Sequence, residues 1–244
     1  MTILRSAIYH LYFWTITLVM AIGSLPVRFL APQLALGYGK IWVRAAFAGL
    51  QPLAGIRIAV TGAEHLPKEG PALIASQHQS AFDTLVWLLL VPRPAYILKS
   101  ELRRIPFFGP MLEPCGQIAV ERGGGARAIR AMLRDASRAE AENRQIIIFP
   151  EGTRRAPGKV GPMQPGVAAL TAHTGLPVIP VVTDSGLAWP RRSFLRRPGT
   201  IRIAILPPLP QGLSRRDLLG RLTELYQAGI DPVGNSVGKP RDRL

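Results

Sequence analysis

A histidine and an aspartate separated by four residues are the first side chains in this sequence that could perform catalysis together. His78 and Asp83 flank the segment Gln79-Ser80-Ala81-Phe82. On a single α-helix, two residues five positions apart point ~140° away from each other, so both cannot lie on one helical face. The pair can meet only if His78 lies in a loop and Asp83 in the first turn of a helix. In that arrangement the carboxylate holds one imidazole nitrogen, and the other nitrogen is available as a general base.

A structural role accounts for the same residues equally well. Ser80-Ala81-Phe82-Asp83 fits a capping box, with Ser80 as the N-cap and Asp83 accepting a hydrogen bond from the backbone N–H of Ser80. The capping role and the catalytic role are compatible. A single histidine near a strand end is more often structural than catalytic, so the catalytic interpretation depends on the other polar residues of the chain.

Further charged residues follow apolar runs that are predicted to be strands. Lys99, Arg122 and Arg154 each stand just after such a run, and Arg154 belongs to the turn Glu151-Gly152-Thr153-Arg154. Ligands bind at the carboxyl ends of the strands in open α/β sheets, and these ends share one edge of a parallel sheet. Arginine pairs with phosphate through two hydrogen bonds. The pattern therefore indicates a site for an anion.

The elements that must position these residues alternate between strand and helix patterns. This alternation is typical of an α/β fold, and we predict a mixed, mostly parallel sheet flanked by helices. Pro180 falls inside one predicted strand, which is expected only at a sheet edge or a bulge. The predicted strands are Ile56–Thr61, Ala72–Ser76, Ala95–Lys99, Gln117–Val120, Gln145–Phe149, Val178–Val182 and Ile201–Leu206, and the predicted helices are 82–91, Gly125–Asn143, Pro165–Thr174 and Ser214–Ala228.

The N-terminal region has a different character from the rest of the chain. Ser6–Val27 contains no Lys, Arg, Asp or Glu, and a helix of that length can cross a hydrocarbon core of ~30 Å. We predict that residues 1–53 form membrane-anchoring helices. A helix that spans the membrane or inserts deeply into it is the first alternative. A helix lying in the interface is the second alternative, and a cleaved signal peptide ending near Ala21-Ile22-Gly23 is the third. Residues 54–228 would form the catalytic domain, and 229–244 a poorly ordered tail.

Composition limits the class of partner. The chain of 244 residues carries a net charge of +15, with 48% apolar residues and a mean hydropathy of +0.18. This excess of basic residues suits an anionic membrane surface or a phosphorylated substrate. Nucleic acid is less favoured, because no zinc-finger, RRM or zipper signature is present. The single cysteine, Cys115, excludes an intrachain disulfide.

Taken together, the motifs resemble those of the glycerolipid acyltransferase family. The matching blocks occur in the family's order, and the resemblance covers roughly 56–206. Within the family, the run from Lys99 to Gly109 is similar to the bacterial 1-acyl-sn-glycerol-3-phosphate acyltransferases. One departure is Gln77, since many members carry Asn directly before the histidine. The four blocks are His78-x4-Asp83, Gly116–Arg122, Phe149-Pro150-Glu151-Gly152-Thr153-Arg154 and Val178-Ile179-Pro180-Val181.

The resemblance implies transfer of an acyl group from acyl-CoA or acyl-carrier protein to the sn-2 hydroxyl of 1-acyl-sn-glycerol 3-phosphate, giving phosphatidic acid. His78 would be the base and Asp83 would fix its tautomer. No metal or cofactor is implied. Pro180 would contact the acyl chain or have a structural role. The residues that would hold the glycerol phosphate are Arg122, Glu151, Gly152, Thr153 and Arg154, with Lys99 as a helper.

Three alternatives remain open at this stage. The acceptor could be a lyso-ornithine lipid or another lysolipid. The histidine and aspartate could activate water in a lipid hydrolase. The chain could also be a non-catalytic, basic membrane-binding protein. For the preferred function we expect residence at the cell inner membrane, with the catalytic domain on the cytoplasmic face, where the basic residues that follow the anchor favour retention.

Overall fold

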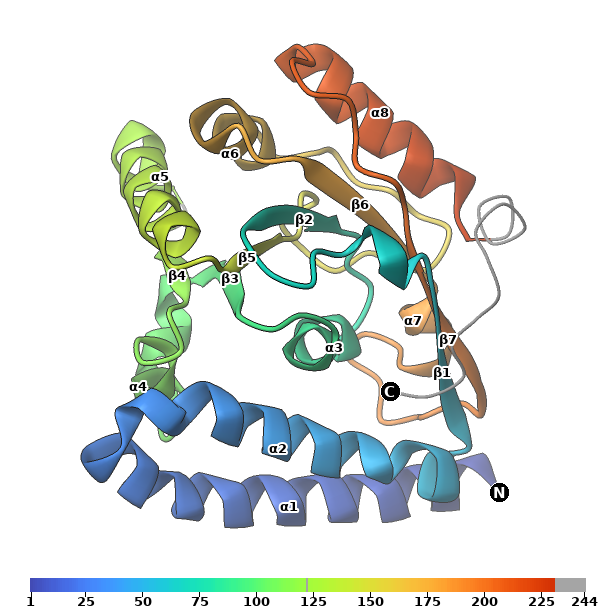
Figure 1. The fold of residues 1–244 in the computed structure, drawn as a ribbon. Coiled ribbons are helices and arrows are strands. Elements are labelled where there is room, and N and C mark those ends of the chain that lie inside the picture. The colour runs from blue at the N-terminus through green and yellow to red at the C-terminus, as the bar shows by residue number, and fades with distance from the viewer. Residues whose placement is uncertain (122, 231–244) are drawn as a thin grey trace.

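The fold is an α/β sheet with helices on both faces, seen here in a computed structural model that describes residues 1–121 and 123–230 (Figure 1). Arg122 and nearly all of the predicted tail lie outside the described residues. In the described part of the chain the strands form one seven-stranded sheet in the order β1-β7-β6-β2-β5-β3-β4. Their bounds are β1 Ile56–Thr61, β2 Ala72–Ser76, β3 Pro94–Lys99, β4 Ile118–Val120, β5 Gln145–Ile148, β6 Val178–Thr183 and β7 Gly199–Ile205.

Strand direction agrees with the predicted fold class. All of the strand pairs in the sheet are parallel except β6 and β7, which run antiparallel. The central strands β2 and β5 are buried along their whole length. Uninterrupted apolar strands of this kind are typical of a parallel sheet covered on both faces. The mixed, mostly parallel sheet is thus confirmed, and each predicted strand and helix is present with bounds within two residues of those expected.

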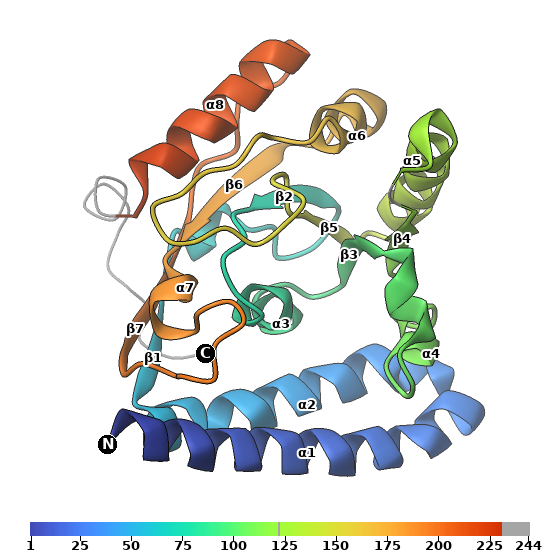
Figure 2. The same cartoon turned by 180° about the vertical axis from the view of Figure 1, so that it is seen from behind.

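Helices cover the two faces of the sheet and create two hydrophobic cores. Successive residues of a strand point to opposite faces. Leu73 therefore packs in the core beneath α5, α6 and α8, and Ile74 packs in the core beneath α1, α2 and α3 (Figures 1 and 2). The helices are α1 Thr2–Leu30, α2 Ala35–Ala48, α3 Phe82–Leu90, α4 Gly109–Leu112, α5 Gly125–Ala141, α6 Gly166–Thr174, α7 Ser185–Ala188 and α8 Arg215–Ala228.

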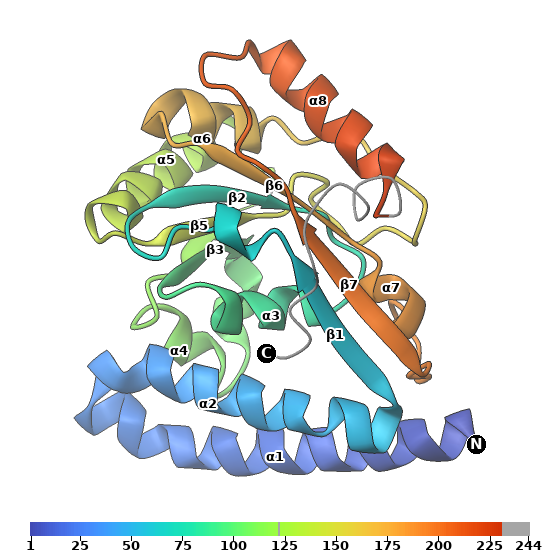
Figure 3. The same ribbon diagram turned by 45° about the vertical axis from the view of Figure 1, so that its right-hand side comes forward.

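The N-terminal helices belong to one of these cores. Helices α1 and α2 lie side by side as a hairpin beneath α3 (Figure 3). Tyr9 from α1 and Val43 and Phe47 from α2 are buried in the same cluster as the strand residue Ile74. Among the described residues, α1 is the one helix long and apolar enough to cross a membrane, although only 6% of its most apolar window is buried in the protein. Helix α1 thus combines a packed face with a long exposed one.

Pro180 corrects one expectation. It lies in β6 between β7 and β2, an interior position, and not at an edge. Its carbonyl accepts the N–H of Leu206 at 2.9 Å, just after β7 ends at Ile205, and the β6–β7 ladder covers only 181–183. Pro180 therefore lies at the end of the β6–β7 pairing, where its carbonyl still bonds to the neighbouring chain and only its own N–H is missing. An interior strand tolerates proline there because the loss falls at the end of the ladder and not in its middle.

Candidate active site

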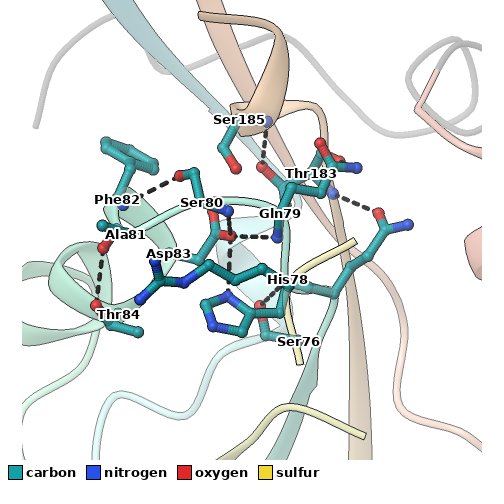
Figure 4. A network of polar contacts seen from close by, with 12 residues as sticks. Ser76, His78, Gln79, Ser80, Ala81, Phe82, Asp83, Thr84, Thr183 and Ser185 are labelled. Atoms are coloured by element: carbon teal, nitrogen blue, oxygen red, sulfur yellow. Dashed lines mark hydrogen bonds and ion pairs between the residues drawn. The ribbon is translucent and has the colours of Figure 1, made fainter. Parts of the chain in front are cut away.

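His78 and Asp83 meet in the connection between β2 and α3, as their spacing requires. His78 Nδ1 lies 3.2 Å from Asp83 Oδ2, and both side chains are buried (Figure 4). An ionised carboxylate only accepts hydrogen bonds, so Nδ1 carries the proton of this contact. The other ring nitrogen, Nε2, then holds the lone pair. The contact thus selects the tautomer of the imidazole that a general base needs.

Asp83 also fixes the backbone of the loop. Its Oδ2 atom accepts the N–H groups of Gln79 at 2.7 Å and Ser80 at 2.8 Å. In turn, the hydroxyl of Ser80 accepts the N–H of Phe82 at 3.0 Å, where α3 begins. The carboxylate half of the predicted capping box is present, whereas the Ser80 hydroxyl bonds to Phe82 in place of Asp83, and the N-cap of α3 is Ala81 in place of Ser80. The structural and catalytic interpretations of the motif therefore coexist, since one carboxylate orients both the imidazole and the start of the helix.

An aromatic ring restricts the imidazole from its other side. Phe149, directly after β5, stacks on His78 with 4.2 Å between ring centroids and an angle of 25° between planes. The backbone carbonyl of His78 accepts the N–H of Arg155 at 2.8 Å. The loop after β5 therefore holds the ring and the backbone of His78. These contacts limit the rotation that would misplace a base.

Glu151 is a buried link between two loops. It is 1% exposed, and its carboxylate accepts the N–H of His78 at 3.3 Å and the N–H of Gly161 at 3.0 Å. Burial raises the pKa of Glu151, and the two backbone hydrogen bonds act in the opposite direction. Both oxygens already bind the protein backbone. The geometry therefore favours a positioning role for Glu151 over the direct phosphate contact expected from the sequence.

Two glutamines beside His78 attach the loop to β6 and α7. Gln77 Oε1 accepts the N–H of Thr183 at 3.2 Å, and Gln79 Nε2 donates to the carbonyl of the same residue at 2.6 Å. Gln79 Oε1 also accepts the N–H of Gly186 at 3.1 Å. The unusual Gln77 is thus bonded to the neighbouring strand. Gln79 was not singled out in the sequence, because nothing local marks a glutamine whose partners lie more than 100 residues away.

The remaining predicted site residues are arranged around this pair. Arg154 is half-buried and interacts electrostatically with Asp83, which raises its pKa, although burial has the larger effect and lowers it. Gly152 has a φ of 65°, a conformation that favours glycine, and Thr153 follows it in the same turn. Lys99 ends β3, two strands from β2, which corresponds to about 10 Å at the usual strand spacing. Arg122 lies outside the described residues.

Comparison with known proteins identifies the family of this chain. The sequence profile of the Acyltransferase family matches residues 57–184. The 1-acyl-sn-glycerol-3-phosphate acyltransferase of Pseudomonas aeruginosa is 34% identical over 82% of this chain and 80% of its own length. The human 1-acyl-sn-glycerol-3-phosphate acyltransferase alpha is 30% identical over 72% of this chain and 63% of its own.

A solved structure gives the same answer for the fold. The crystal structure of the 1-acyl-sn-glycerophosphate (LPA) acyltransferase PlsC from Thermotoga maritima superposes with a TM-score of 0.77 at 27% identity. The match covers 98% of this chain and all of that one. The long N-terminal helix is included, because the match spans almost the whole chain. By sequence profile, by relatives and by structure, the chain belongs to the acyltransferase family.

Proposed function

We propose that the protein transfers an acyl group to the sn-2 hydroxyl of 1-acyl-sn-glycerol 3-phosphate and forms phosphatidic acid. The observation that carries the proposal is the contact of His78 Nδ1 with Asp83 Oδ2 at 3.2 Å, within an acyltransferase fold. The acceptor is inferred from relatives in a bacterium and in human, which are both named for acylation of this lipid. The donor would be acyl-CoA or acyl-carrier protein.

The reaction follows from the orientation of the imidazole. His78 Nε2 removes the proton of the acceptor hydroxyl as its oxygen attacks the thioester carbonyl. Asp83 stabilises the imidazolium that forms. The tetrahedral intermediate then expels the thiolate, which takes the same proton from Nε2, so the ester and the free thiol are the products. General base catalysis of this kind contributes ~10²–10⁴-fold to the rate.

The anion of the acceptor requires cationic partners close to the base. Among the described arginines, Arg154 is best supported for this role, because the charge of Asp83 acts on its guanidinium group and raises its pKa. Lys99, the last residue of β3, and Arg122, two residues past β4 in the sequence, remain proposals. Gly152 and Thr153 would let the backbone and a hydroxyl approach the phosphate. Pro180, inside the buried β6, fits the structural rather than the acyl-binding role.

A panel of acceptors tests the proposal directly. Purified protein would be incubated with labelled acyl-CoA and with lysophosphatidic acid, lyso-ornithine lipid or no acceptor. We expect the highest rate with lysophosphatidic acid, and a fall of about tenfold to a hundredfold for Arg154→Ala, since charge-assisted hydrogen bonds contribute ~1.5–3 kcal/mol. Preference for lyso-ornithine lipid would replace the proposed acceptor. Release of free fatty acid at the same rate without an acceptor would identify a hydrolase instead.

We also propose that the exposed face of α1 attaches the protein to a membrane. Buried residues near both ends of the helix, Ser6 and Ser24, keep it against the protein along most of its length, which favours a helix lying in the interface over one that crosses the bilayer. Its outer face carries large apolar side chains at helical spacing, each between 38% and 73% exposed. They are Leu4, Ile8, Leu11, Leu18, Ile22, Leu25 and Phe29.

Attachment is tested best by a point substitution, because α1 contributes Tyr9 to the core and its deletion would disturb the fold. Leu18→Glu removes one apolar contact worth ~1.5–3 kcal/mol, so binding to phosphatidylglycerol vesicles should weaken at least about tenfold. Ile129→Glu on α5, across the sheet, is the matched control. Equal sedimentation of the two variants would place the attachment elsewhere. In the cell we propose the inner membrane, with the catalytic domain on the cytoplasmic face.

A further inference from the structure

The loop that connects α7 to β7 brings arginines to the candidate active site. This basic loop, residues 189–197, contains Arg191 and Arg192, both of them exposed. Arg191 Nη1 donates a hydrogen bond of 2.9 Å to the backbone carbonyl of Arg154. The contact joins the loop to the turn that follows β5.

The charges of Arg191 and Arg192 also act on the guanidinium group of Arg154. Burial lowers the pKa of Arg154 most, and the charges of Arg191 and Arg192 lower it further, while Asp83 raises it. Like charges at this range repel one another in the free protein. A bound anion would reverse this effect, because each guanidinium could then share a phosphate oxygen.

Helix α1 holds the basic loop in place. The hydroxyl of Ser6 accepts the N–H of Arg196 at 2.8 Å, and its single proton has two carbonyl acceptors, that of Thr2 at 2.7 Å and that of Arg196 at 3.3 Å. His10 Nε2 lies 2.8 Å from the carbonyl oxygen of Phe194, and the two rings stack with 4.7 Å between centroids. The contacts of Ser6 and His10 with the loop join positions 184 to 190 residues apart in the sequence. The loop is therefore fixed by tertiary contacts with the N-terminal helix.

A second set of contacts fixes the loop toward the catalytic turn. Trp189 lies edge-on to Tyr9 at 5.8 Å and is tilted against Phe82 at 6.4 Å. The buried guanidinium of Arg196 covers the Trp189 ring at 4.4 Å. Arg192 has a φ of 55°, which is costly for a residue with a side chain and persists only where the surroundings determine it. The two exposed arginines thus stand on a rigid support.

We propose that Arg191 and Arg192 complete, with Arg154, a binding site for a phosphate group of the substrates, and that α1 positions them through the basic loop. This inference rests on the proposed acyl transfer. The ligand is a phosphate that carries up to two charges, and it has two possible sources. One is the phosphate monoester of the acceptor lipid, and the other is the phosphates of the CoA part of the donor. Both offer several oxygens to a cluster of guanidinium groups.

The test compares Arg191→Gln/Arg192→Gln with Arg197→Gln, an exposed arginine of the same loop whose charge does not contribute to the pKa of Arg154. Kinetics are measured in micelles of an uncharged detergent, where no anionic surface contributes. For the double variant we expect the KM of one phosphate-bearing substrate to rise about tenfold, as for a lost charge-assisted contact. We expect kcat to change less than KM, and Arg197→Gln to stay within about twofold.

The outcomes separate the two sources. A higher KM for lysophosphatidic acid with an unchanged KM for acyl-CoA assigns the site to the acceptor. A higher KM for acyl-CoA with an unchanged KM for lysophosphatidic acid assigns the site to the donor. The wild type and the double variant should then use acyl-carrier protein as donor equally well. Unchanged KM values with weaker sedimentation on phosphatidylglycerol vesicles would overturn the proposal in favour of a membrane contact. Unchanged values in every assay would overturn it outright.

A binding measurement keeps this test separate from the proposed function. Thermal stabilisation of the wild type by glycerol 3-phosphate or by CoA, lost in the double variant and kept in Arg197→Gln, would support the phosphate site even if lysophosphatidic acid were not acylated. Equal stabilisation of all three proteins would refute the site even if acylation were observed.

Discussion

The catalytic turn, residues 77–83, and the basic loop, residues 189–197, both interact with Arg154 but are built in different ways. In the catalytic turn every residue except Ala81 is buried. In the basic loop the arginines that face the site are exposed, and Trp189 and Arg196 are the buried supports. A general base works only in one orientation, whereas a cation attracts a phosphate over a range of positions. The degree of burial follows from these two tasks.

The two regions should therefore fail differently when altered. Loss of the base or of its partner should reduce turnover, because the chemical step itself is affected. Loss of a support beneath the basic loop should act mainly on substrate binding, and by smaller factors. Each of the following variants tests that difference.

Removal of the imidazole should have the largest effect. His78→Ala leaves no group to accept the hydroxyl proton, so we expect kcat to fall at least ~10²-fold. Thermal unfolding and vesicle sedimentation should stay close to those of the wild type. A folded His78→Ala protein with near wild-type turnover would show that another group is the base.

Asp83→Asn should combine a catalytic defect with a loss of stability. Asp83 Oδ2 accepts from His78 and from two backbone N–H groups, so the amide oxygen of Asn should take its place. The imidazolium formed in the reaction would then lose the stabilising charge of the carboxylate. We expect kcat to fall on the order of 10²-fold. The N–H groups of Gln79 and Ser80 would lose a charged acceptor, which should lower the free energy of unfolding by about 1 kcal/mol or more.

Urea unfolding measured beside the kinetics separates these two effects. Lower stability with normal turnover would mean that Asp83 is only a helix cap. The opposite result, normal stability with lost turnover, would mean that the backbone contacts contribute little.

The catalytic turn was predictable because its decisive contacts are local. Asp83 binds His78, Gln79 and Ser80, all within five residues, so the spacing in the sequence contains the geometry. The sheet was predictable for a similar reason, since apolar runs bounded by glycine and proline mark each strand. Pro180 misled the prediction, because the end of the β6–β7 pairing is a property of the assembled sheet.

The basic loop was not predictable as part of the site. Its charged part, Arg191-Arg192-Ser193-Phe194-Leu195-Arg196-Arg197, fits a solvated loop or a membrane contact. Its partners on α1 lie at the other end of the chain, and no periodicity links them. The same limit applies to Gln79, and it also concealed the fact that the predicted anchor helix shares the core and supports the site.

Ser6→Ala should weaken the support without touching the chemistry. Ser6 is fully buried, and its loss leaves the N–H of Arg196 without an acceptor, which costs about 1–3 kcal/mol of stability. We expect the KM of the phosphate-bearing substrate to rise several-fold, with kcat much less affected. Ser24→Ala is the matched control, because Ser24 is also buried on α1 and its hydroxyl donates to the carbonyl of Ala21 within the same helix. Equal KM values for the two variants would argue that α1 does not position the basic loop.

His10 should give the smallest effect and the finest test of the support. It holds the basic loop in two ways, through the hydrogen bond to the carbonyl of Phe194 and through the stacked rings. His10→Phe keeps a ring for stacking and removes the hydrogen bond, whereas His10→Ala removes both. A partly exposed hydrogen bond contributes about 0.5–1.5 kcal/mol and an aromatic pair about as much. We therefore expect KM to rise by less than about tenfold in either variant, and more in His10→Ala than in His10→Phe, with kcat preserved. A fall in kcat without a change in KM would contradict the division of tasks, because it would mean that the basic loop acts on the base itself.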